Sequence, residues 1–452
     1  MKEKLLKALQ DKDFSELFKK GGVSFLMRVG GQVLGFALTL IISRFFGAKG
    51  LGDYVLAIIV LRIFSLIAKL GLDTFSLRFI SALAIKNDWK SIFYLKRKAN
   101  NVLIISSLLL SVILFISSGF ISSFIGIEKW YLQLNAFIVI PLTFFMLHYQ
   151  SLRGLKKIAE FSFFYGPSQA LFSILIIIIA LNFTDSKDIP IYSYAVSTVV
   201  VFLLSKVILD YWLRKKKDFN ATEKLSELTT FSILRVSSPF LFVQAVQLLL
   251  GWTDKLMLSV IVTPNISSGV MSSSEEVGIY HTVVKLSMFA GIFLMSINSI
   301  SAPKFSELYS RNDLSALERV SNQSSKMIFW LSLPLVIIFF TFPRFFLGIF
   351  GEEFKTGVYA FILLSCGRLI SSFAGSAGSM LQMTGNQFIY MNILGIGLLI
   401  NIVLNYIFIP IFGMNGAAFS SMMSLVAWNV GMVWAVRKKL GFYTCYMPFV
   451  RL

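Results

Sequence analysis

The stretch from Leu51 to Phe79 reads LGDYVLAIIVLRIFSLIAKLGLDTFSLRF, and it decides the fold class of the chain. It is apolar enough to lie in a bilayer, yet it carries Arg62, Lys69, Asp73 and Arg78. One charged side chain at the centre of a membrane costs about 2.5–3.5 kcal/mol on the insertion scale. Arg62, Lys69 and Asp73 recur at helical spacing, which places them on one stripe of a helix. We interpret this stripe as a binding surface that faces something other than lipid.

The composition of the whole chain agrees with a membrane location. The mean hydropathy is +0.75, 56% of residues are hydrophobic and 14% are charged, whereas about a quarter of the residues of a soluble domain are charged. Residues 1–21 form a charged amphipathic segment with no apolar core and no small-residue cleavage site. This segment is not typical of a cleaved signal peptide, and we expect it to lie in the cytoplasm.

We predict an all-α polytopic membrane protein with about 12 spans, each about 20 residues long, the length that crosses hydrocarbon. The first six lie at 22–46, 53–72, 99–121, 131–152, 160–183 and 191–213, and the second six at 231–263, 277–303, 327–349, 357–383, 388–410 and 416–436. Prolines and glycines in or near the spans are expected to kink them. These residues are Pro141, Pro167, Pro239, Pro303, Pro334, Gly71, Gly154, Gly291 and Gly385.

The spans divide into two lobes of six helices. A basic run at 214–217 ends the sixth span, so we predict an N-lobe at 22–217, a cytoplasmic linker at 218–230, a C-lobe at 231–440 and a cytoplasmic tail at 441–452. A shift of 226 residues aligns Gly52 and Tyr54 with Gly278 and Tyr280, which indicates a diverged repeat. The same shift makes Lys304 the counterpart of Arg78. Transporters built from repeats commonly place their site between the repeats.

The loop charges predict the orientation of the chain. All but four of the lysines and arginines in loops and tails fall on one side, and the four exceptions are Lys49, Lys129, Lys187 and Lys355. Under the positive-inside rule both termini are cytoplasmic. The net charge of +19 is therefore an orientation signal, and a nucleic-acid partner is not expected.

The spans also contain more positive than negative charge. The carboxylates in these regions are mainly Asp53, Asp73 and Asp254, and Asp73 is placed to pair with Lys69 at i,i+4. An unpaired excess of buried cations is typical of a water-filled cavity that takes an anionic ligand. Arginine suits phosphate through its bidentate fork. The candidate substrate-cavity residues are Arg28, Arg62, Lys69, Arg78, Arg235, Lys255, Lys285 and Arg368.

Polar residues in the seventh and eleventh spans allow two interpretations. Gln244, Gln247 and Asp254 lie on one face of the seventh span. They form interhelical hydrogen bonds, worth about 1 kcal/mol each, or Asp254 is a coupling site for Na⁺ or a proton. Asn392, Asn401 and Asn405 of the eleventh span either line the cavity or bridge helices.

Enzyme and metal motifs are absent from the sequence. There is no G-x-x-x-x-G-K-[ST] loop, and the two histidines, His148 and His281, have no nucleophile-elbow context. The two cysteines, Cys366 and Cys445, have no neighbours at metal-ligand spacing. We therefore expect a transporter with no catalytic residue, no metal ligand and no cofactor beyond a possible coupling ion.

Residues 25–81 resemble the opening of the O-antigen-type polysaccharide flippases of the multidrug/oligosaccharidyl-lipid/polysaccharide (MOP) exporter superfamily. The matching features are Arg28, the R-F-F-G end of the first span at Arg44–Gly47, the G-x-Y of Gly52 and Tyr54, the Gly71–Leu72 break and Arg78. The G-M-N-G-A-A segment at Gly413–Ala418 also resembles this family.

The resemblance implies two six-helix lobes around a basic central cavity, as in MATE transporters. It implies a flippase that carries an undecaprenyl-pyrophosphate-type oligosaccharide from the cytoplasmic to the outer leaflet for O-antigen or other surface polysaccharide. The implied location is the bacterial inner membrane, with membrane lipids, a polysaccharide polymerase and chain-length machinery as partners. Asp254 matches the position of a sodium ligand in some relatives, and Asp73 is a second candidate for ion coupling. The alternative function is a cation-coupled multidrug antiporter of the same fold.

Overall fold

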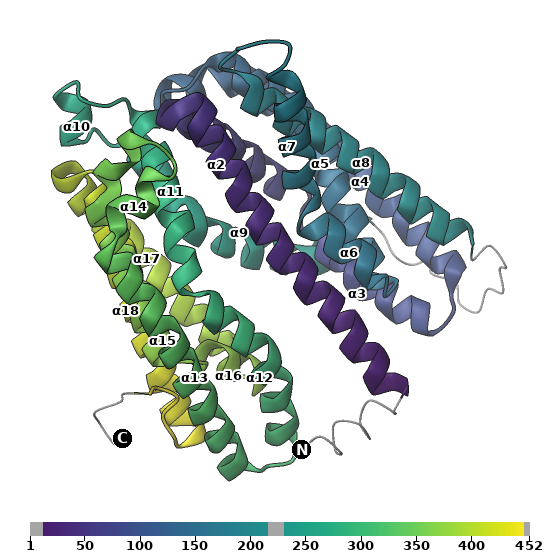
Figure 1. The fold of residues 1–452 in the computed structure, drawn as a ribbon. Coiled ribbons are helices and arrows are strands. Elements are labelled where there is room, and N and C mark those ends of the chain that lie inside the picture. Colours follow the sequence, from purple (N-terminus) through teal and green to yellow (C-terminus); the bar gives the residue numbers. More distant parts are fainter. Residues whose placement is uncertain (1–11, 216–229, 447–452) are drawn as a thin grey trace. The chain divides into compact units, whose positions relative to one another are not determined.

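The computed structural model describes residues 12–215 and 230–446 and builds them entirely from helices and short connections (Figure 1). The first helix, α2 (Lys12–Ala68), joins the first two predicted spans and turns between them at Gly47, where φ is 69° and ψ is −177°. This positive φ is costly for any residue with a side chain. The break that was expected at Gly71 is present, because α3 (Leu72–Ile85) begins directly after it.

Five more helices complete the N-terminal half. They are α4 (Trp89–Ile125), α5 (Lys129–Gly154), α6 (Ile158–Tyr165), α7 (Ser168–Ala180) and α8 (Ile189–Arg214). The helices α6 and α7 form one bent span, with an angle of 50° between them. The bend lies at Gly166–Pro167, since proline cannot donate the next helical hydrogen bond. A side chain at Gly31 of α2 would place its Cβ 2.8 Å from the Gly166 carbonyl carbon, so α2 crosses closely at this bend.

The C-terminal half repeats the alternation of long and broken helices. It contains α9 (Thr230–Val260), α10 (Pro264–Ser267), α11 (Ser273–Ala290), α12 (Ile292–Ser310), α13 (Leu314–Thr341), α14 (Pro343–Gly348), the 3₁₀ helix η1 (Glu352–Gly357), α15 (Val358–Ala374), α16 (Ala377–Met383), α17 (Gln387–Phe412) and α18 (Met414–Leu440). The pair α11 and α12 bends by 49° at Gly291. The predicted tenth span, 357–383, is divided into α15 and α16 by Gly375, which has a φ of 65°.

The described helices confirm a polytopic membrane protein. Within residues 12–215 and 230–446, nine helices are long and apolar enough to cross a membrane, and eleven spans result if each bent pair is one span. The segment Leu26–Ala68 is one of the nine, although it turns at Gly47. Its two arms correspond to two predicted spans, which agrees with the expected twelve.

The chain packs as two compact units. The first consists of Met1–Phe45 and Ala57–Leu248, and the second of Phe46–Leu56 and Leu249–Leu452, in each case as far as the structure describes them. The packing therefore changes within α9, at Leu248–Leu249, whereas the predicted lobe border is the linker at 218–230. Residues 216–229 of that linker lie outside the described residues.

In the first unit, α5 packs against α3, α4 and α8. The face of α4 toward α5 carries small buried residues, including Ser111, Ser118 and Ser122. Ser111 Oγ donates a 2.5 Å hydrogen bond to the Ala136 carbonyl of α5. Small side chains let membrane helices approach closely and add hydrogen bonds where lipid offers none.

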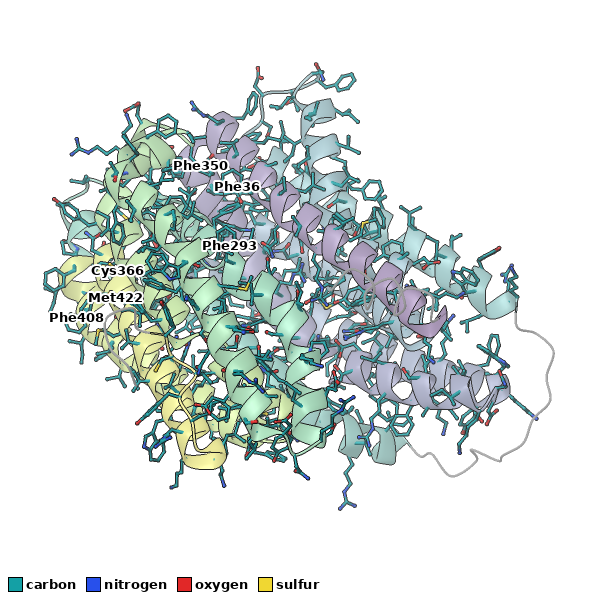
Figure 2. The ribbon with its side chains drawn as sticks, turned by 60° about the horizontal axis from the view of Figure 1, so that its bottom comes forward. Phe36, Phe293, Phe350, Cys366, Phe408 and Met422 are labelled. Atoms are coloured by element: carbon teal, nitrogen blue, oxygen red, sulfur yellow. The ribbon has the colours of Figure 1, made fainter. Side chains whose placement is uncertain are left out.

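In the second unit, α18 packs against both α15 and α17. Cys366 and Met422, labelled in Figure 2, belong to the α15–α18 pair. A Cβ on Gly367 would come within 3.4 Å of the Met422 Cα, so the glycine allows this close approach. The last described residues also belong to the unit, since Ser325 Oγ donates to the Thr444 carbonyl at 2.6 Å.

The two glycines that the repeat aligned, Gly52 and Gly278, meet in the second unit. A Cβ on Gly52 would lie 1.6 Å from the Ser274 carbonyl oxygen, and one on Gly278 would lie 2.0 Å from the Ala48 carbonyl oxygen and 2.9 Å from the Gly52 nitrogen. Both helices therefore cross with their backbones in contact. No residue other than glycine fits this crossing without moving the backbone.

Two sharp turns in this unit are stabilised in the same way, by a glycine and a distant carboxylate. The chain turns at Gly47 and at Gly413, which has a φ of 55°, and in each case a new helical arm begins directly afterwards. The first backbone N–H after each glycine donates to a distant carboxylate: Ala48 N to Glu353 Oε1 at 2.5 Å, and Met414 N to Glu276 Oε1 at 2.9 Å. A carboxylate stabilises the start of a helix by satisfying an unpaired N–H.

Removal of the Glu276 carboxylate should destabilise the second unit. Glu276 is fully buried and also accepts from Thr263 Oγ1 at 2.7 Å. In Glu276→Ala two buried donors lose their acceptor, and each such loss costs about 1–3 kcal/mol. We expect a clear fall in the midpoint of thermal unfolding in detergent, with no change for Glu318→Ala at an exposed position of α13. Equal midpoints for the two variants would contradict the role of Glu276.

Candidate substrate and ion site

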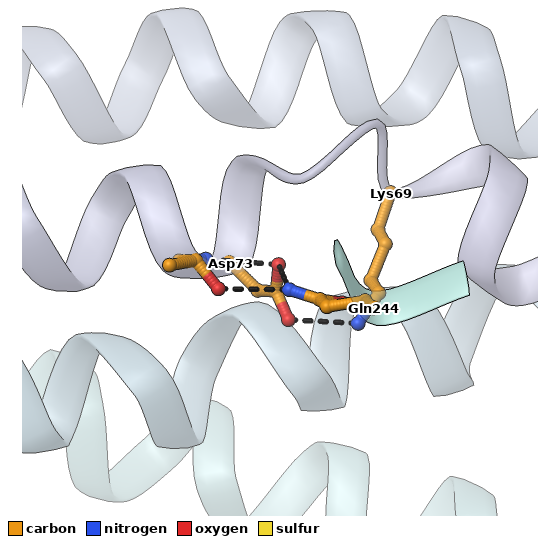
Figure 3. Close-up of polar contacts among 4 residues, drawn as sticks. Lys69, Asp73 and Gln244 are labelled. Carbon is orange, nitrogen blue, oxygen red and sulfur yellow. Dashed lines mark hydrogen bonds and ion pairs between the residues drawn. The ribbon is translucent and has the colours of Figure 1, made fainter. Parts of the chain in front are cut away.

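A polar cluster surrounds the break between α2 and α3 in the first unit (Figure 3). Lys69 Nζ and Asp73 Oδ2 lie 2.8 Å apart, and both residues are buried, at 8% and 2% exposure. Gln244 Nε2 of α9 donates to Asp73 Oδ1 at 3.1 Å and to Thr74 Oγ1 at 2.8 Å. The predicted pair of Lys69 and Asp73 is confirmed, and the predicted polar face of α9 contributes an interhelical hydrogen bond.

The local sequence explains why this cluster forms at a break. Leu70 and Gly71 have φ values of 50° and 75°, a left-handed conformation that ends α2 and that glycine adopts readily. A Cβ on Gly71 would lie 2.3 Å from the Ser237 carbonyl oxygen of α9. Gly71 therefore both turns the chain and lets α9 approach closely enough for Gln244 to reach Asp73.

A second polar cluster is centred on Asp254 in the second unit. Its carboxylate accepts hydrogen bonds from Tyr280 Oη at 2.9 Å, from Asn405 Nδ2 at 2.8 Å and from Ser421 Oγ. These donors come from α11, α17 and α18. Asn405 Nδ2 also donates to Asn401 Oδ1 at 3.1 Å. Asn405 thus links α17 to α9, and Asn401 Nδ2 donates to Ser421 Oγ of α18 at 3.4 Å, so both asparagines bridge helices.

The Asp254 cluster is rich in oxygen atoms. Asn405 Oδ1 is buried and has no hydrogen-bond partner within the described part of the chain. Together with the Asp254 carboxylate, Asn401 Oδ1 and Ser421 Oγ, it offers one negative charge and several neutral oxygens. Hard cations such as Na⁺ prefer oxygen ligands, as Ca²⁺ and Mg²⁺ do, so this donor set fits a monovalent cation.

Beside Asp254 lies a cationic cluster formed by Lys255, Lys285 and Arg368. Lys255 is 5% exposed, and its ammonium donates to the Gly251 carbonyl at 3.2 Å. Lys285 lies on α11, and Arg368 of α15 reaches the end of that helix, since a Cβ on Gly291 would lie 3.8 Å from the Arg368 Cδ. Lys255 and Asp254 thus point to different partners, as expected of neighbours on a helix.

The eight predicted cavity cations differ in their surroundings. Among the described residues, Lys255, Lys285 and Arg368 form no ion pair, while Lys69 has one. By exposure, Lys69 and Lys255 are buried, Arg62, Lys285 and Arg368 are half-buried, and Arg28, Arg78 and Arg235 are exposed.

Several residues of these clusters were not predicted. Ser421 reaches Asp254 across 167 residues, and its helix gave no sign of this role in the sequence. The sequence identifies Tyr280 only as the repeat counterpart of Tyr54, and its hydrogen bond to Asp254 is a finding of the structure. Outside these clusters, the role of Glu276 at the Gly413 corner was also not predicted, although this carboxylate lies just before a predicted span and has no cation near it in the sequence.

Taken together, broken helices, buried cations and an oxygen-rich carboxylate site are typical of membrane transporters. The sequence comparison then gives the family. Residues 17–309 match the model of the family described as polysaccharide biosynthesis protein, and residues 239–407 match the MatE model. The chain belongs to the polysaccharide biosynthesis protein family, a part of the MOP superfamily, as its resemblance predicted.

Curated relatives are similar over parts of their length. The probable low-salt glycan biosynthesis flippase Agl15 of Haloferax volcanii is 24% identical over 52% of this chain and 46% of its own. The probable lipid II flippase MurJ of Buchnera aphidicola is 24% identical over 73% of this chain and 64% of its own. The matched part thus spans between about half and two thirds of these relatives. Both relatives are named as probable flippases.

Solved structures confirm the fold. The inward-facing conformation of a multidrug resistance MATE family transporter has a TM-score of 0.69 at 16% identity, and the alignment covers 93% of this chain and 98% of that one. The lipid II flippase MurJ in an inward closed conformation has a TM-score of 0.71 at 13% identity, with coverage of 91% and 87%. The chain is therefore a multi-pass membrane protein with a MOP fold.

Proposed function

We propose that the protein is a flippase that moves an anionic lipid-linked oligosaccharide, of the undecaprenyl-pyrophosphate type, from the cytoplasmic to the outer leaflet. The product would supply the synthesis of a surface polysaccharide such as an O-antigen. Alternating access between the two sides would carry the headgroup past the basic residues of the spans. The proposed location is the inner membrane of a bacterium with both termini in the cytoplasm, beside a polymerase and chain-length machinery.

The cationic cluster of Lys255, Lys285 and Arg368 is the observation that carries this proposal. Three cations without an ion pair in the described part of the second unit are costly to keep in a membrane protein unless an anion joins them. Lys255 is buried, and its ammonium donates to one acceptor within the described residues, the Gly251 backbone carbonyl. A pyrophosphate supplies both the negative charge that these three cations lack and several oxygen atoms that accept hydrogen bonds.

A multidrug antiporter remains the second candidate, and the favouring observation is the MATE-like fold with a TM-score of 0.69. A site for organic cations would require carboxylates and aromatic side chains. The cluster in the second unit instead combines Lys255, Lys285 and Arg368 with a single carboxylate, Asp254. The sign of the charge therefore supports the flippase.

We further propose that Asp254 couples transport to Na⁺ or to a proton. The carboxylate has no ion-pair partner among the described residues and is surrounded by neutral oxygens of Asn401, Asn405 and Ser421. Asp73 is the weaker candidate because Lys69 already neutralises it. A bound cation would take the place of the hydrogen bonds that Asp254 accepts in this structure.

A substitution at Asp254 should separate the two candidate coupling ions. In wild-type protein we expect Na⁺ to raise the midpoint of thermal unfolding relative to K⁺, because a ligand that binds the folded state stabilises it. Asp254→Asn should abolish this difference, whereas Asp210→Asn in the first unit should keep it. If Na⁺ and K⁺ act alike on the wild type while a pH gradient drives flipping, the proton is the coupling ion. If Na⁺ does not raise the unfolding midpoint and a pH gradient does not drive flipping, the coupling role of Asp254 is wrong.

Deletion of the gene tests the function itself. The flippase predicts that surface polysaccharide disappears while a lipid-linked repeat unit accumulates on the cytoplasmic leaflet. Complementation with the wild-type gene should restore the polysaccharide. Unchanged polysaccharide together with new sensitivity to cationic drugs would instead establish the antiporter.

A further inference from the structure

The buried ammonium of Lys69 can donate more hydrogen bonds than its surroundings accept. A lysine ammonium carries three N–H donors. Within residues 12–215 and 230–446, its acceptor is Asp73 Oδ2 alone, at 2.8 Å, and the side chain is 10% exposed. Two donors of a buried cation are therefore left for another acceptor.

Asp73 is held in place independently of Lys69. Its other oxygen, Oδ1, accepts from the Thr74 backbone N–H at 2.8 Å and from Gln244 Nε2 at 3.1 Å. The same amide of Gln244 donates to Thr74 Oγ1 (Figure 3). Neutral donors thus fix the carboxylate, while the lysine is attached by a flexible four-carbon stem. If the pair opens, the lysine is the partner that moves.

The surroundings of the pair contain a second cation that could bind the same anion. Lys69 lies at the end of α2, where Leu70 takes a φ of 50°. Arg62 lies two helical turns earlier on the same stripe of α2 and is half-buried. An anion that meets Arg62 on this stripe would therefore also be near the end of α2 that carries the released lysine.

We propose that Asp73 is an internal substitute for the phosphate of the substrate, an inference that rests on the proposed function. In the empty protein Asp73 neutralises Lys69. A pyrophosphoryl group offers more charge and more acceptor oxygens than one carboxylate, so it takes over the ammonium. Asp73 keeps its bonds from Thr74 and Gln244, and Lys69 returns to it when the substrate leaves. The buried lysine is thereby never left without a counter-charge.

The proposal makes different predictions for single and double substitutions. Asp73→Asn keeps an acceptor for Thr74 and Gln244 but releases Lys69, so anion binding should become about tenfold tighter, as expected for one charge-assisted hydrogen bond gained. The double variant Lys69→Met with Asp73→Asn removes both charges. It should unfold close to the wild-type temperature yet bind the anion about tenfold more weakly than wild type.

The experiment uses the full-length protein in detergent and a second ion pair as the control. Lys96 Nζ and Asp210 Oδ1 lie 2.6 Å apart between α4 and α8 of the same unit. Dissociation constants are measured by titration with farnesyl pyrophosphate, with inorganic pyrophosphate and with farnesol. The control variant Lys96→Met with Asp210→Asn should bind each probe as the wild type does. If the substitutions at Lys69 and Asp73 change the dissociation constants of both phosphate probes, the pair recognises the phosphate alone. If they change only that of farnesyl pyrophosphate, the lipid contributes to binding. Either result supports the exchange of Asp73 for the substrate phosphate.

Two results would overturn the exchange, and they differ from failure of the function. If Asp73→Asn binds the phosphates no more tightly than wild type, Asp73 does not compete with the phosphate for the Lys69 ammonium. If the double variant binds as the wild type does, the pair is only structural. If the wild type itself binds neither phosphate, the anionic substrate is wrong and both proposals fall together.

Discussion

Arg368→Gln and Lys285→Gln should each lower the rate of glycolipid flipping by about ten- to hundredfold, because each removes a hydrogen bond to a charged group worth about 1.5–3 kcal/mol. Both cations are half-buried and form no ion pair in the described part of the second unit. Their charge is therefore not required to neutralise a neighbouring carboxylate. Its loss should affect the substrate anion more than the stability of the protein.

The measurement is flipping of a fluorescent lipid-linked oligosaccharide in proteoliposomes, with membrane-inserted protein quantified in parallel. Lys326→Gln is the matched control, since this lysine is exposed on α13 and also loses one positive charge. We expect it to flip at the wild-type rate. Wild-type flipping by the double variant of Arg368 and Lys285 would show that the cluster does not bind the headgroup. A fall in inserted protein that matches the fall in flipping would assign the residues to folding instead.

Gly52→Ala should destabilise the second unit by about 3 kcal/mol, at the upper end of what an overpacked site costs. The added Cβ would lie 1.6 Å from the Ser274 carbonyl oxygen. A backbone atom cannot turn aside as a side chain does, so α2 and α11 must separate. We expect a lower midpoint of unfolding and a loss of flipping.

The same substitution at an open glycine provides the control. A Cβ on Gly395 of α17 would meet nothing within 4 Å. Gly395→Ala should keep or slightly raise stability, because alanine favours a helix interior by about 1 kcal/mol over glycine. If both alanine variants unfold alike, the crossing of Gly52 and Gly278 is looser than it is in this structure.

The fold could be predicted from the sequence because each span is a local pattern. Length and hydropathy alone locate the spans, although helices extend beyond some of them: α4 begins at Trp89 and α13 at Leu314, before the predicted starts at 99 and 327. The breaks were harder to predict: the chain bends at Pro167, yet the helices run through Pro141, Pro239 and Pro334. A proline removes one hydrogen bond, but the packing of neighbouring helices decides whether the helix then bends. At Pro167 two further conditions hold: Gly166 precedes the proline, and α2 crosses closely at Gly31. The presence of a proline does not by itself indicate either condition.

The candidate site divides in the same way. The pair of Lys69 and Asp73 could be predicted because the two residues are four apart in the sequence. The expected shared helix face is absent, however, because α2 ends at Ala68 and the pair forms across the break at Gly71. The partners of Asp254 lie 151 and 167 residues away at Asn405 and Ser421. No local period connects them, and only tertiary packing brings them together. The sequence could therefore predict that Asp254 is a candidate site residue, but it could not predict which side chains donate hydrogen bonds to it.

The corner at Gly47 has a consequence for the order of assembly. Its first N–H, on Ala48, is bonded to Glu353, which follows 305 residues later in the chain. Because N-terminal parts of a protein are synthesised and folded first, the arms of α2 reach the membrane long before η1 exists. The turn at Gly47 is thus synthesised early but receives its hydrogen bond from Ala48 to Glu353 late. A nascent chain that stalls before Glu353 would expose this turn to quality-control proteases.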